Sequence, residues 1–401
     1  MHPFIHLHVH SQYSLLDGQA SIQRLVDKAM NDGMRAIALT DHGAMYGIKE
    51  FLNYCNKKNG PRKTEIANLK KEIDALTQGE DADGRKEALQ QQLQAAEQKL
   101  FKPIVGCECY LARRDRFSQS EKIDGSGWHL VVLAKNLTGY KNLIKIVSKS
   151  WTEGFYYRPR IDKELLEQHS EGLIVSSACL GGEISRKVDS GQTSDAEEAV
   201  QWYKRVFGDD YYLELQRHKT NRPDADQSTY PKQERVNQEL IRIARKYDVK
   251  LIATNDVHFV NEEDADAHDR LICLSTGKDF DDPDRMRYTK QEWLKSTEEM
   301  NRIFADIPEA LTNTLEVADK VEFYSIDNPP LMPFYPIDPA FGTEEQYREK
   351  YPEQVLMEEF GKDTFHRLGD YDKVIRVKLE ADYLAHLTFQ GAQRRYGEEL
   401  T

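Results

Sequence analysis

Side chains that can bind a metal ion stand at the predicted ends of several strands in this sequence. His8 and His10 end the first predicted strand, and Asp17 follows in the next loop. Later strands are followed by His, carboxylate or thiol groups in the same way. The full set of candidate ligands is His8, His10, Asp17, His42, Glu108, His129, Cys179, Asp256 and His258. Because functional groups of parallel α/β barrels collect at the carboxyl ends of the strands, we expect these side chains to converge.

The chemical types in this set indicate a polynuclear metal site. Imidazole and carboxylate groups suit zinc, manganese or iron, and a thiolate such as Cys179 favours zinc. The set is too large for one tetrahedral ion, so we expect two or three divalent ions, with zinc preferred and manganese, iron or magnesium as alternatives. Neighbouring divalent ions lower the pKa of a bridging water and neutralise phosphoryl oxygens. The expected chemistry is phosphoester hydrolysis by a metal-bound water, without a protein nucleophile.

Each candidate ligand taken alone has a common structural explanation. A histidine at a strand end is usually structural or solvated, and Cys179 alone is typical of a small buried residue. His129 also departs from the pattern, because it begins its predicted strand. The joint occurrence of these residues at strand ends is what favours a metal site. Among the other histidines, His6 is expected to pack below the site. No role is predicted for His268. Surface positions are expected for His2, His169, His218, His366 and His386.

The elements that must position these residues alternate between strand and helix. Residues 4–10 alternate apolar residues with histidine, which predicts a strand, and residues 21–32 form an amphipathic pattern with Ser21 as N-cap. Further strands are predicted at 35–40, 103–106, 129–134, 172–177 and 250–254, and helices at 137–150, 194–206 and 230–247. Repeated β–α units favour a parallel sheet or barrel.

Residues 61–100 interrupt this alternation. Apolar residues recur there at steps of three and four on both sides of a polar, glycine-containing stretch at 79–84. This spacing predicts an antiparallel helical hairpin inserted between two core elements. A charged, solvated insertion without a hairpin is the alternative.

The alternation fades after about residue 278, so we divide the chain into a first domain, 1–278, and a second region, 279–401. Helices are predicted at 305–322, 343–360 and 371–396, and the prolines between 329 and 339 predict an extended stretch. No closing element follows the last helix, so we expect the chain to be a piece of a longer protein.

The composition of the sequence limits the kinds of partner that the protein can bind and the cellular compartment that suits it. The net charge of −13 is not the footprint of a general DNA-binding protein, so any contact with nucleic acid must be local or helped by metal ions. The five cysteines include no C-x-x-C pair, which fits reduced thiols in the cytoplasm. No apolar run reaches about 18 residues, so no membrane-spanning helix is expected.

The segments around the candidate ligands resemble the PHP family, the polymerase and histidinol phosphatase domains. The resemblance rests on Leu7-His8-Val9-His10-Ser11, Thr40-Asp41-His42-Gly43, Gly106-Cys107-Glu108, Trp128-His129-Leu130, Ser177-Ala178-Cys179 and Asn255-Asp256-Val257-His258-Phe259. The segments 14–18, 154–162, 306–310 and 383–392 are similar to the N-terminal part of the alpha subunits of bacterial DNA polymerase III.

This resemblance implies a distorted (β/α)7 barrel, followed by a mostly helical start of a polymerase region. It places the family's metal positions on the candidate ligands given above, all of which are metal-competent here. It also implies a DNA-directed DNA polymerase, a nucleotidyltransferase, as the parent protein, with 3′→5′ exonuclease proofreading in this part. The implied partners are a DNA primer-template, the sliding clamp and the clamp loader. The polymerase's own catalytic motifs are absent from this sequence, so we expect no polymerisation by this chain alone.

Basic and aromatic residues beside the predicted site are candidates for DNA contacts, because aromatic rings and arginines suit single-stranded DNA. They are Arg113, Arg114, Arg116, Arg158, Arg160, Tyr156 and Tyr157. A solvated loop, or packing against a polymerase region, explains them equally well. Two alternatives to the exonuclease also stay open. One is a metal-stabilised scaffold that docks the polymerase body or a separate exonuclease, and the other is a stand-alone phosphatase for small monoesters such as histidinol phosphate.

Overall fold

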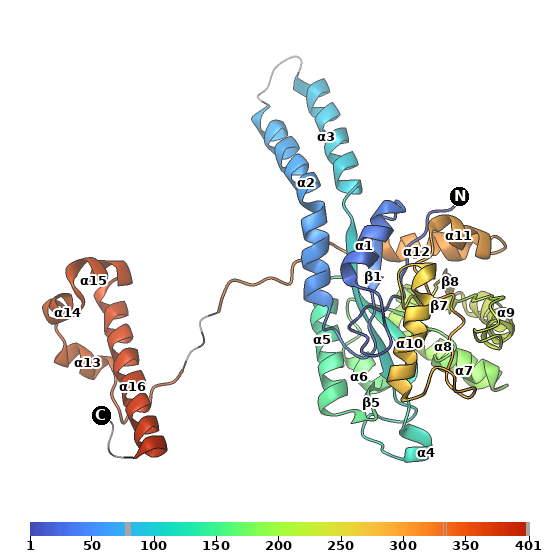
Figure 1. The fold of residues 1–401 in the computed structure, drawn as a ribbon. Coiled ribbons are helices and arrows are strands. Elements are labelled where there is room, and N and C mark those ends of the chain that lie inside the picture. The colour runs from blue at the N-terminus through green and yellow to red at the C-terminus, as the bar shows by residue number, and fades with distance from the viewer. Residues whose placement is uncertain (77–81, 332, 334, 398–401) are drawn as a thin grey trace. The chain divides into compact units, whose positions relative to one another are not determined.

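The computed structural model describes residues 1–401 except 77–81, 332, 334 and 398–401, and it contains two compact units, Met1–Ile326 and Asp327–Thr401 (Figure 1). Residues 279–326 therefore pack with the first unit, so the predicted limit at residue 278 is not a break in packing. Where the PHP-like domain ends as a family unit stays a prediction.

A curled sheet forms the centre of the first unit. Its order is β4-β5-β2-β3-β6-β7-β8, and β1 also pairs with β2. The strands are β1 Ala36–Leu39, β2 Lys102–Leu111, β3 Trp128–Ala134, β4 Phe155–Tyr156, β5 Arg158–Ile161, β6 Leu173–Ser176, β7 Tyr211–Leu215 and β8 Lys250–Ala253. The predicted α/β class is confirmed by this sheet and the helices around it.

The sheet is mixed, whereas repeated β–α units predicted parallel strands. β3 runs antiparallel to both β2 and β6. A parallel return needs a crossover connection, usually a helix, but β2 reaches β3 through a loop that holds only the short helix α4, Glu121–Asp124. The first residues of β3 consequently lie at the same edge of the sheet as the last residues of β2 and β6.

The N-terminal segment closes the curl of the sheet. Residues 4–10 make only an isolated bridge, at Val9, and bend at His8, so the regular strand predicted there is absent from the described structure. The backbone N–H of Ala38 donates to the carbonyl of His6 at 2.9 Å, and that of His10 donates to the carbonyl of Val257 at 2.7 Å. The segment thereby joins β1 to the chain that follows β8.

Apolar side chains fill both faces of the curled sheet. Along β2, Val105 belongs to the large cluster under the outer helices, whereas Ile104 belongs to a smaller cluster with Ile5, Val131 and Ile252. Val317 on α12 joins this smaller cluster, which is fully apolar. Because successive strand residues point to opposite faces, Glu108 shares the face of Ile104.

Helices cover the outside of the sheet. They are α1 Ile22–Asn31, α5 Leu137–Thr152, α6 Lys163–Gln168, α7 Glu183–Asp189, α8 Thr193–Phe207, α9 Thr229–Tyr247, α10 Ala265–Thr276, α11 Thr297–Ile303 and α12 Pro308–Lys320, with 3-10 turns at Gly208–Asp210 and Glu262–Asp264. The predicted N-cap of α1 is confirmed, since the Ser21 side chain accepts a hydrogen bond from the backbone N–H of Arg24.

A long helical hairpin projects from the first unit, as predicted (Figure 1). Its arms are α2, Ile48–Ala75, and α3, Ala82–Gln98, and they pack through a cluster that includes Ile66, Leu69 and Leu89. The first arm is the second part of α2, which begins at Ile48. No break in helical structure therefore marks the predicted start of the insertion at residue 61. Of the stretch predicted to separate the arms, 79–81 lie outside the described residues and 82–84 are helical.

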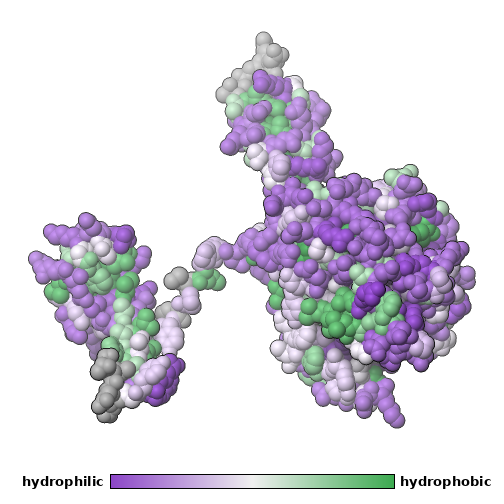
Figure 2. Space-filling model, viewed as in Figure 1, coloured by the Kyte–Doolittle hydropathy of each residue, from purple (hydrophilic) through white to green (hydrophobic). Residues whose placement is uncertain are grey.

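The second unit has its own small core. It contains α13 Glu344–Lys350, α14 Glu353–Phe360, α15 Lys362–Leu368 and α16 Tyr371–Tyr396. The helix predicted over 343–360 is two helices, because Pro352 interrupts it. Leu356, Phe365 and Val374 are buried between these helices. Among the described residues, no helix is long and apolar enough to cross a membrane, and the surface in Figure 2 is largely hydrophilic.

Candidate metal centre

Glu108 lies at the middle of the candidate ligands. Its carboxylate is fully buried, with Oε2 2.6 Å from His42 Nδ1 and Oε1 2.8 Å from His129 Nδ1. His8 Nε2 lies 3.2 Å from Oε1 of the same carboxylate. His10 Nε2 lies 3.6 Å from Oε2. One carboxylate therefore connects four imidazoles that come from distant parts of the chain.

The remaining candidates join this group through two aspartates and a thiol. Asp256 Oδ1 lies 3.2 Å from both His8 Nε2 and His10 Nε2. Asp17 Oδ2 lies 2.8 Å from His42 Nε2 and 3.7 Å from His258 Nε2. The Cys179 Sγ lies 3.6 Å from His129 Nδ1. Every candidate ligand predicted from the sequence thus belongs to one connected cluster.

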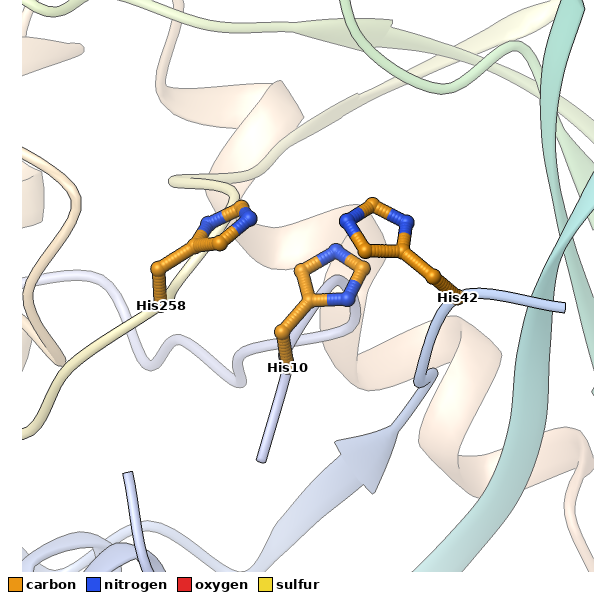
Figure 3. Close-up of side chains that lie close together, drawn as sticks. All are labelled: His10, His42 and His258. Carbon is orange, nitrogen blue, oxygen red and sulfur yellow. The ribbon is translucent and has the colours of Figure 1, made fainter. Parts of the chain in front are cut away.

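The strand ends bring these side chains together. His42 follows β1, Glu108 lies in the second half of β2, Cys179 follows β6, and Asp256 follows β8. His129 belongs to the same edge because β3 runs antiparallel to its neighbours. The exception noted in the sequence is therefore explained by strand direction. Figure 3 shows His10, His42 and His258 reaching one another from three separate segments.

Strained backbone accompanies several of these positions. Leu16, beside Asp17, has φ 61°, and Ala178, beside Cys179, has φ 57°. Asp256 itself has φ 46°. A left-handed conformation at a residue other than glycine costs on the order of 1–3 kcal/mol and concentrates at functional sites. The fold therefore holds these ligands in place at some expense of stability.

Several buried polar atoms of the cluster have no hydrogen-bond partner. They are His8 Nε2, His10 Nε2, His42 Nδ1, Glu108 Oε2, Asp256 Oδ1 and His258 Nε2. An unsatisfied buried polar group costs about 1–3 kcal/mol, so such a concentration needs an explanation. All of these residues except Asp256 belong to groups whose ligand atoms lie within 4.8 Å of one another: His8 with His10 and Glu108, His10 with His42 and His258, and His42 with Glu108 and His129. The donor set and its spacing fit divalent metal ions.

The charges in the cluster shift its protonation equilibria. Burial disfavours a charged imidazole at His8, but Asp256, Glu214 and Glu108 outweigh it and raise the pKa of His8 well above its usual value. Burial likewise opposes protonation of His258, and Asp17 overrides it to raise the pKa to about 9. At Glu108, burial is outweighed by the surrounding imidazoles, which lower the carboxyl pKa. The carboxylates are thus ionised and suited to bind cations.

A second layer of polar residues orients the ligands, and the sequence did not point to it. Glu214, buried on β7, lies with Oε2 3.0 Å from His8 Nδ1. Ser14 Oγ lies 3.0 Å from His10 Nδ1 and donates to Asp41 at 2.8 Å. Tyr288 donates its hydroxyl to Asp17 at 2.9 Å. The one available signal for Glu214 is a single carboxylate within the otherwise apolar strand Tyr211–Leu215.

A cavity of about 510 Å³ opens beside the cluster. Its walls include the candidate ligands Asp17, His42 and Cys179 and the tyrosines Tyr110 and Tyr288. The arginines that line it are Arg158, Arg186 and Arg287. We call these the rim arginines. Within the described part of the chain, no carboxylate forms an ion pair with any of them. The cavity therefore places three arginines without such ion pairs next to the cluster.

The predicted DNA contacts separate into different groups. Arg160 is fully buried and donates to the backbone carbonyls of Gly154, Ser118, Asp124 and Arg116. Arg116 is also buried and pairs with Glu153 and Asp162. Both arginines hold the loop after β2 in place, so the prediction that they are free to contact DNA is wrong.

The other predicted DNA contacts are more exposed. Arg114 pairs with Asp124, and Arg113 donates to Ser126 Oγ at 3.4 Å. Tyr156 and Tyr157 stack on each other edge to face, with ring centroids 4.8 Å apart. Of the predicted set, only Arg158 lines the cavity. DNA contacts by these residues stay a prediction.

The remaining histidines differ in how well their predicted positions agree with the structure. His218, predicted at the surface, is buried and lines the cavity, with Nε2 3.2 Å from the carbonyl oxygen of Asn255. The prediction failed because the loop after β7 folds inward. His6 packs below the site as expected, with Nε2 2.8 Å from the carbonyl oxygen of Lys295. His268 is buried between His258 and Tyr288.

Comparison with known proteins places the chain among relatives of known family. Residues 6–218 match the PHP domain family. The DNA polymerase III subunit alpha of Borreliella burgdorferi is 40% identical over 349 residues, which cover 86% of this chain and 26% of the relative. The subunit alpha of Treponema pallidum is 36% identical and covers 94% of this chain and 28% of the relative. The subunit alpha of Thermus aquaticus is 33% identical over 99% of this chain and 26% of the relative.

The chain spans about a quarter of the length of these relatives. The family match covers more than half of the chain and includes the candidate ligands from His8 to Cys179. Asp256 and His258 lie beyond the match but within the same compact unit and the same cluster. The chain belongs to the PHP domain family.

Proposed function

We propose that this chain is a metal-dependent phosphoesterase that removes nucleotides from the 3′ end of DNA. The observation that carries the proposal is the set of buried, unpartnered ligand atoms that face one another in the candidate metal centre. Imidazoles, carboxylates and a thiol at this spacing would hold two or three divalent ions, zinc before manganese, iron or magnesium. Bound ions would supply an activated water and stabilise charge on the phosphoryl oxygens.

The residues of the chain have distinct parts in this proposal. The candidate ligands would hold the ions, and no side chain would act as nucleophile. Glu214 and Tyr288 would fix the orientation of His8 and Asp17 through the contacts that they make with them. The rim arginines would attract the anionic substrate into the cavity.

The parent protein in this proposal is a replicative DNA polymerase, a nucleotidyltransferase that works in the cytoplasm. Its support is the similarity to proteins named DNA polymerase III subunit alpha. The parent would act on a primer-template with the sliding clamp and clamp loader. The first domain, 1–278, would carry the hydrolytic site, and 279–401 would begin the polymerase region. Polymerisation by this chain alone is not expected.

A structural role for the metal ions is the second candidate function. The cluster joins the N-terminal segment to β2 and to the loop after β8, so bound ions would brace the barrel for docking of a polymerase body or a separate exonuclease. In that case chelation lowers the thermal stability of the protein, while no DNA is cleaved. A stand-alone phosphatase would instead turn over a small monoester such as histidinol phosphate faster than a DNA end.

The deciding experiment measures metal content by elemental analysis and 3′→5′ cleavage of a recessed primer on the same purified sample. We expect bound transition metal and cleavage in the unchanged protein, and loss of both in His10→Ala and Asp256→Ala. His386→Ala is the matched control, because this exposed histidine lies in the second unit. Cleavage that persists in both site variants would assign the activity to another site or a contaminant.

A further inference from the structure

A loop beyond the family match forms one wall of the cavity. Residues 278–292 follow α10 without regular structure, and the buried ion pair between Arg285 and Asp269 fixes their first half. Lys290, also buried, fixes the second half through Asp224 at 2.6 Å and Asp266 at 2.8 Å. We call this segment the wall loop. Two buried charged residues thus hold the wall loop in one position against the rest of the unit.

The residues between the two anchors face the cavity. Met286, Arg287 and Tyr288 all line it, and Tyr288 donates to Asp17 in the metal centre. The Arg287 guanidinium donates to the backbone carbonyls of Pro283 at 2.9 Å and Asp282 at 3.2 Å. These carbonyls hold the guanidinium in place, but they carry no net charge. Arg287 is therefore positioned, and no carboxylate of the described residues forms an ion pair with it.

The other rim arginines come from different elements. Arg158 begins β5, with its guanidinium 5.5 Å from the centroid of the Tyr110 ring, and that ring stacks on His42. Arg186 lies on α7 and is exposed. Three separate segments thus direct arginines at one cavity.

Carboxylates also line the cavity, but among the described residues none forms an ion pair with these arginines. Glu292, which also lines the cavity, accepts hydrogen bonds from the backbone N–H groups of Thr289 at 3.1 Å and Gln291 at 2.8 Å. Asp17 and Asp256 are engaged with the imidazoles and Tyr288. Divalent ions bound in the cluster would offset the charge of its own carboxylates and thiolate. The additional guanidinium charges therefore have capacity for further phosphates of the same substrate.

We propose that the rim arginines bind successive backbone phosphates of a single-stranded polynucleotide whose 3′ end enters the metal centre, with Arg287 of the wall loop as the best-positioned contact. The inference rests on the proposed function in taking a phosphodiester as the substrate. It deepens that function by excluding small monoesters as the preferred substrate class. It also gives residues 278–292 a part in the hydrolytic site, although the sequence assigns most of them to the region after it.

The test measures binding and does not depend on cleavage. The probe is a fluorescein-labelled single-stranded DNA of about eight nucleotides with phosphorothioate linkages at its 3′ end, and its affinity is followed by anisotropy over a range of salt concentrations. Each phosphate contact on a single strand contributes about 0.7 to the slope of log affinity against log salt. Arg287→Gln should lower the slope by about 0.7 and weaken binding about fivefold near 0.1 M salt.

Matched variants separate this contact from a general charge effect. Arg158→Gln and Arg186→Gln should lower the slope by a similar amount, and the triple variant by about 2. Arg205→Gln removes the same charge from an exposed position on α8, away from the cavity, and should leave the slope unchanged. Equal melting temperatures show that the variants are folded. Slopes in the rim variants equal to that of the unchanged protein would overturn the inference.

Hydrolysis of bis(p-nitrophenyl) phosphate by the unchanged protein tests the proposed function separately. Hydrolysis of this small diester together with unchanged slopes in the rim variants would overturn the inference and leave the proposed function standing. A third outcome is that the slopes are reduced in the rim variants while the unchanged protein hydrolyses neither the diester nor the recessed primer. That result would retain the polynucleotide site and overturn the proposed phosphoesterase function.

Discussion

Glu108 shows at the scale of a single residue why the candidate metal centre needs cations. It is buried, it faces several imidazoles, and its Oε2 has no hydrogen-bond partner. A hydrophobic core does not assemble such a group for stability, because burial of charged atoms with incomplete hydrogen bonding is costly. Divalent ions held by the carboxylate and the imidazoles would make the arrangement favourable. Residues that orient these ligands should then control metal affinity as much as the ligands themselves.

Glu214 is the clearest of these orienting residues. Its carboxylate contacts His8 Nδ1 at 3.0 Å and accepts hydrogen bonds from Ser176 at 2.5 Å and Thr254 at 2.6 Å. Glu214→Gln should weaken metal binding by about 10–100-fold, because the amide no longer fixes the imidazole with a charge. Competition with a chelator of known affinity measures the change. Glu239→Gln, exposed on α9, is the control and should retain normal affinity.

Lys295 should give the stability of the fold a distinctive pH dependence. Burial lowers the pKa of its ammonium group from 10.5 to about 7, against the opposing effect of Glu292 and Glu299. Between these values the unfolded chain binds more protons than the folded chain, so the free energy of unfolding rises as pH increases from about 7 to about 10.5. Lys295→Met should flatten this rise. Urea unfolding at several pH values measures it, and parallel curves for the two proteins would contradict the prediction.

At the scale of elements, strand direction and connection length decide where the ligands meet. The described connection between β2 and β3 holds no long crossover helix, so β3 returns antiparallel, and this direction places His129 beside Glu108. The helical hairpin α2–α3 has its own apolar contacts and adds no candidate ligand to the centre. The hairpin should therefore open without disturbing the centre.

Leu69→Ala tests that independence. Leu69 is buried against the other arm of the hairpin, and removing its side chain should destabilise the hairpin by about 2 kcal/mol. Amide hydrogen exchange should become faster within α2 and α3 beyond residue 60, but not in β2 or β3. Lys71→Ala, on the exposed side of α2, is the matched control. Loss of metal affinity in Leu69→Ala would show that the hairpin and the centre are coupled.

At the scale of the whole molecule, the two compact units differ in their dependence on metal ions. All candidate ligands belong to Met1–Ile326, and among the described residues of Asp327–Thr401 none belongs to the cluster. Ligands that bind only the folded state stabilise it by about 2.7 kcal/mol at a hundredfold excess over Kd. The unit that holds the centre should gain this stability, and the other should not.

Chelation should therefore lower one thermal transition by several degrees and leave the other unchanged. Differential scanning calorimetry with and without a chelator measures both transitions, and circular dichroism of the helical second unit helps to assign them. Restoring the metal should restore the first transition. A first transition that does not respond to chelation would contradict both the catalytic and the structural roles of bound ions.

The sequence by itself determined the candidate ligands and the family. Their chemical types and their places at predicted strand ends are local properties, and so are the helix periodicities that predict α1, α5, α8, α9 and α16. The hairpin was also predictable, since each arm carries its own apolar spacing.

Only the tertiary structure decided the antiparallel course of β3, the burial of Arg160 and His218, and the contacts of Glu214 and Tyr288 with the ligands. These features depend on which distant segments meet. Strand pairing and burial are decided by packing across the whole sheet, and a local pattern of residue types does not contain that information. The same reason explains why the wall loop looked like the start of another region, although its anchors fold it against the metal centre.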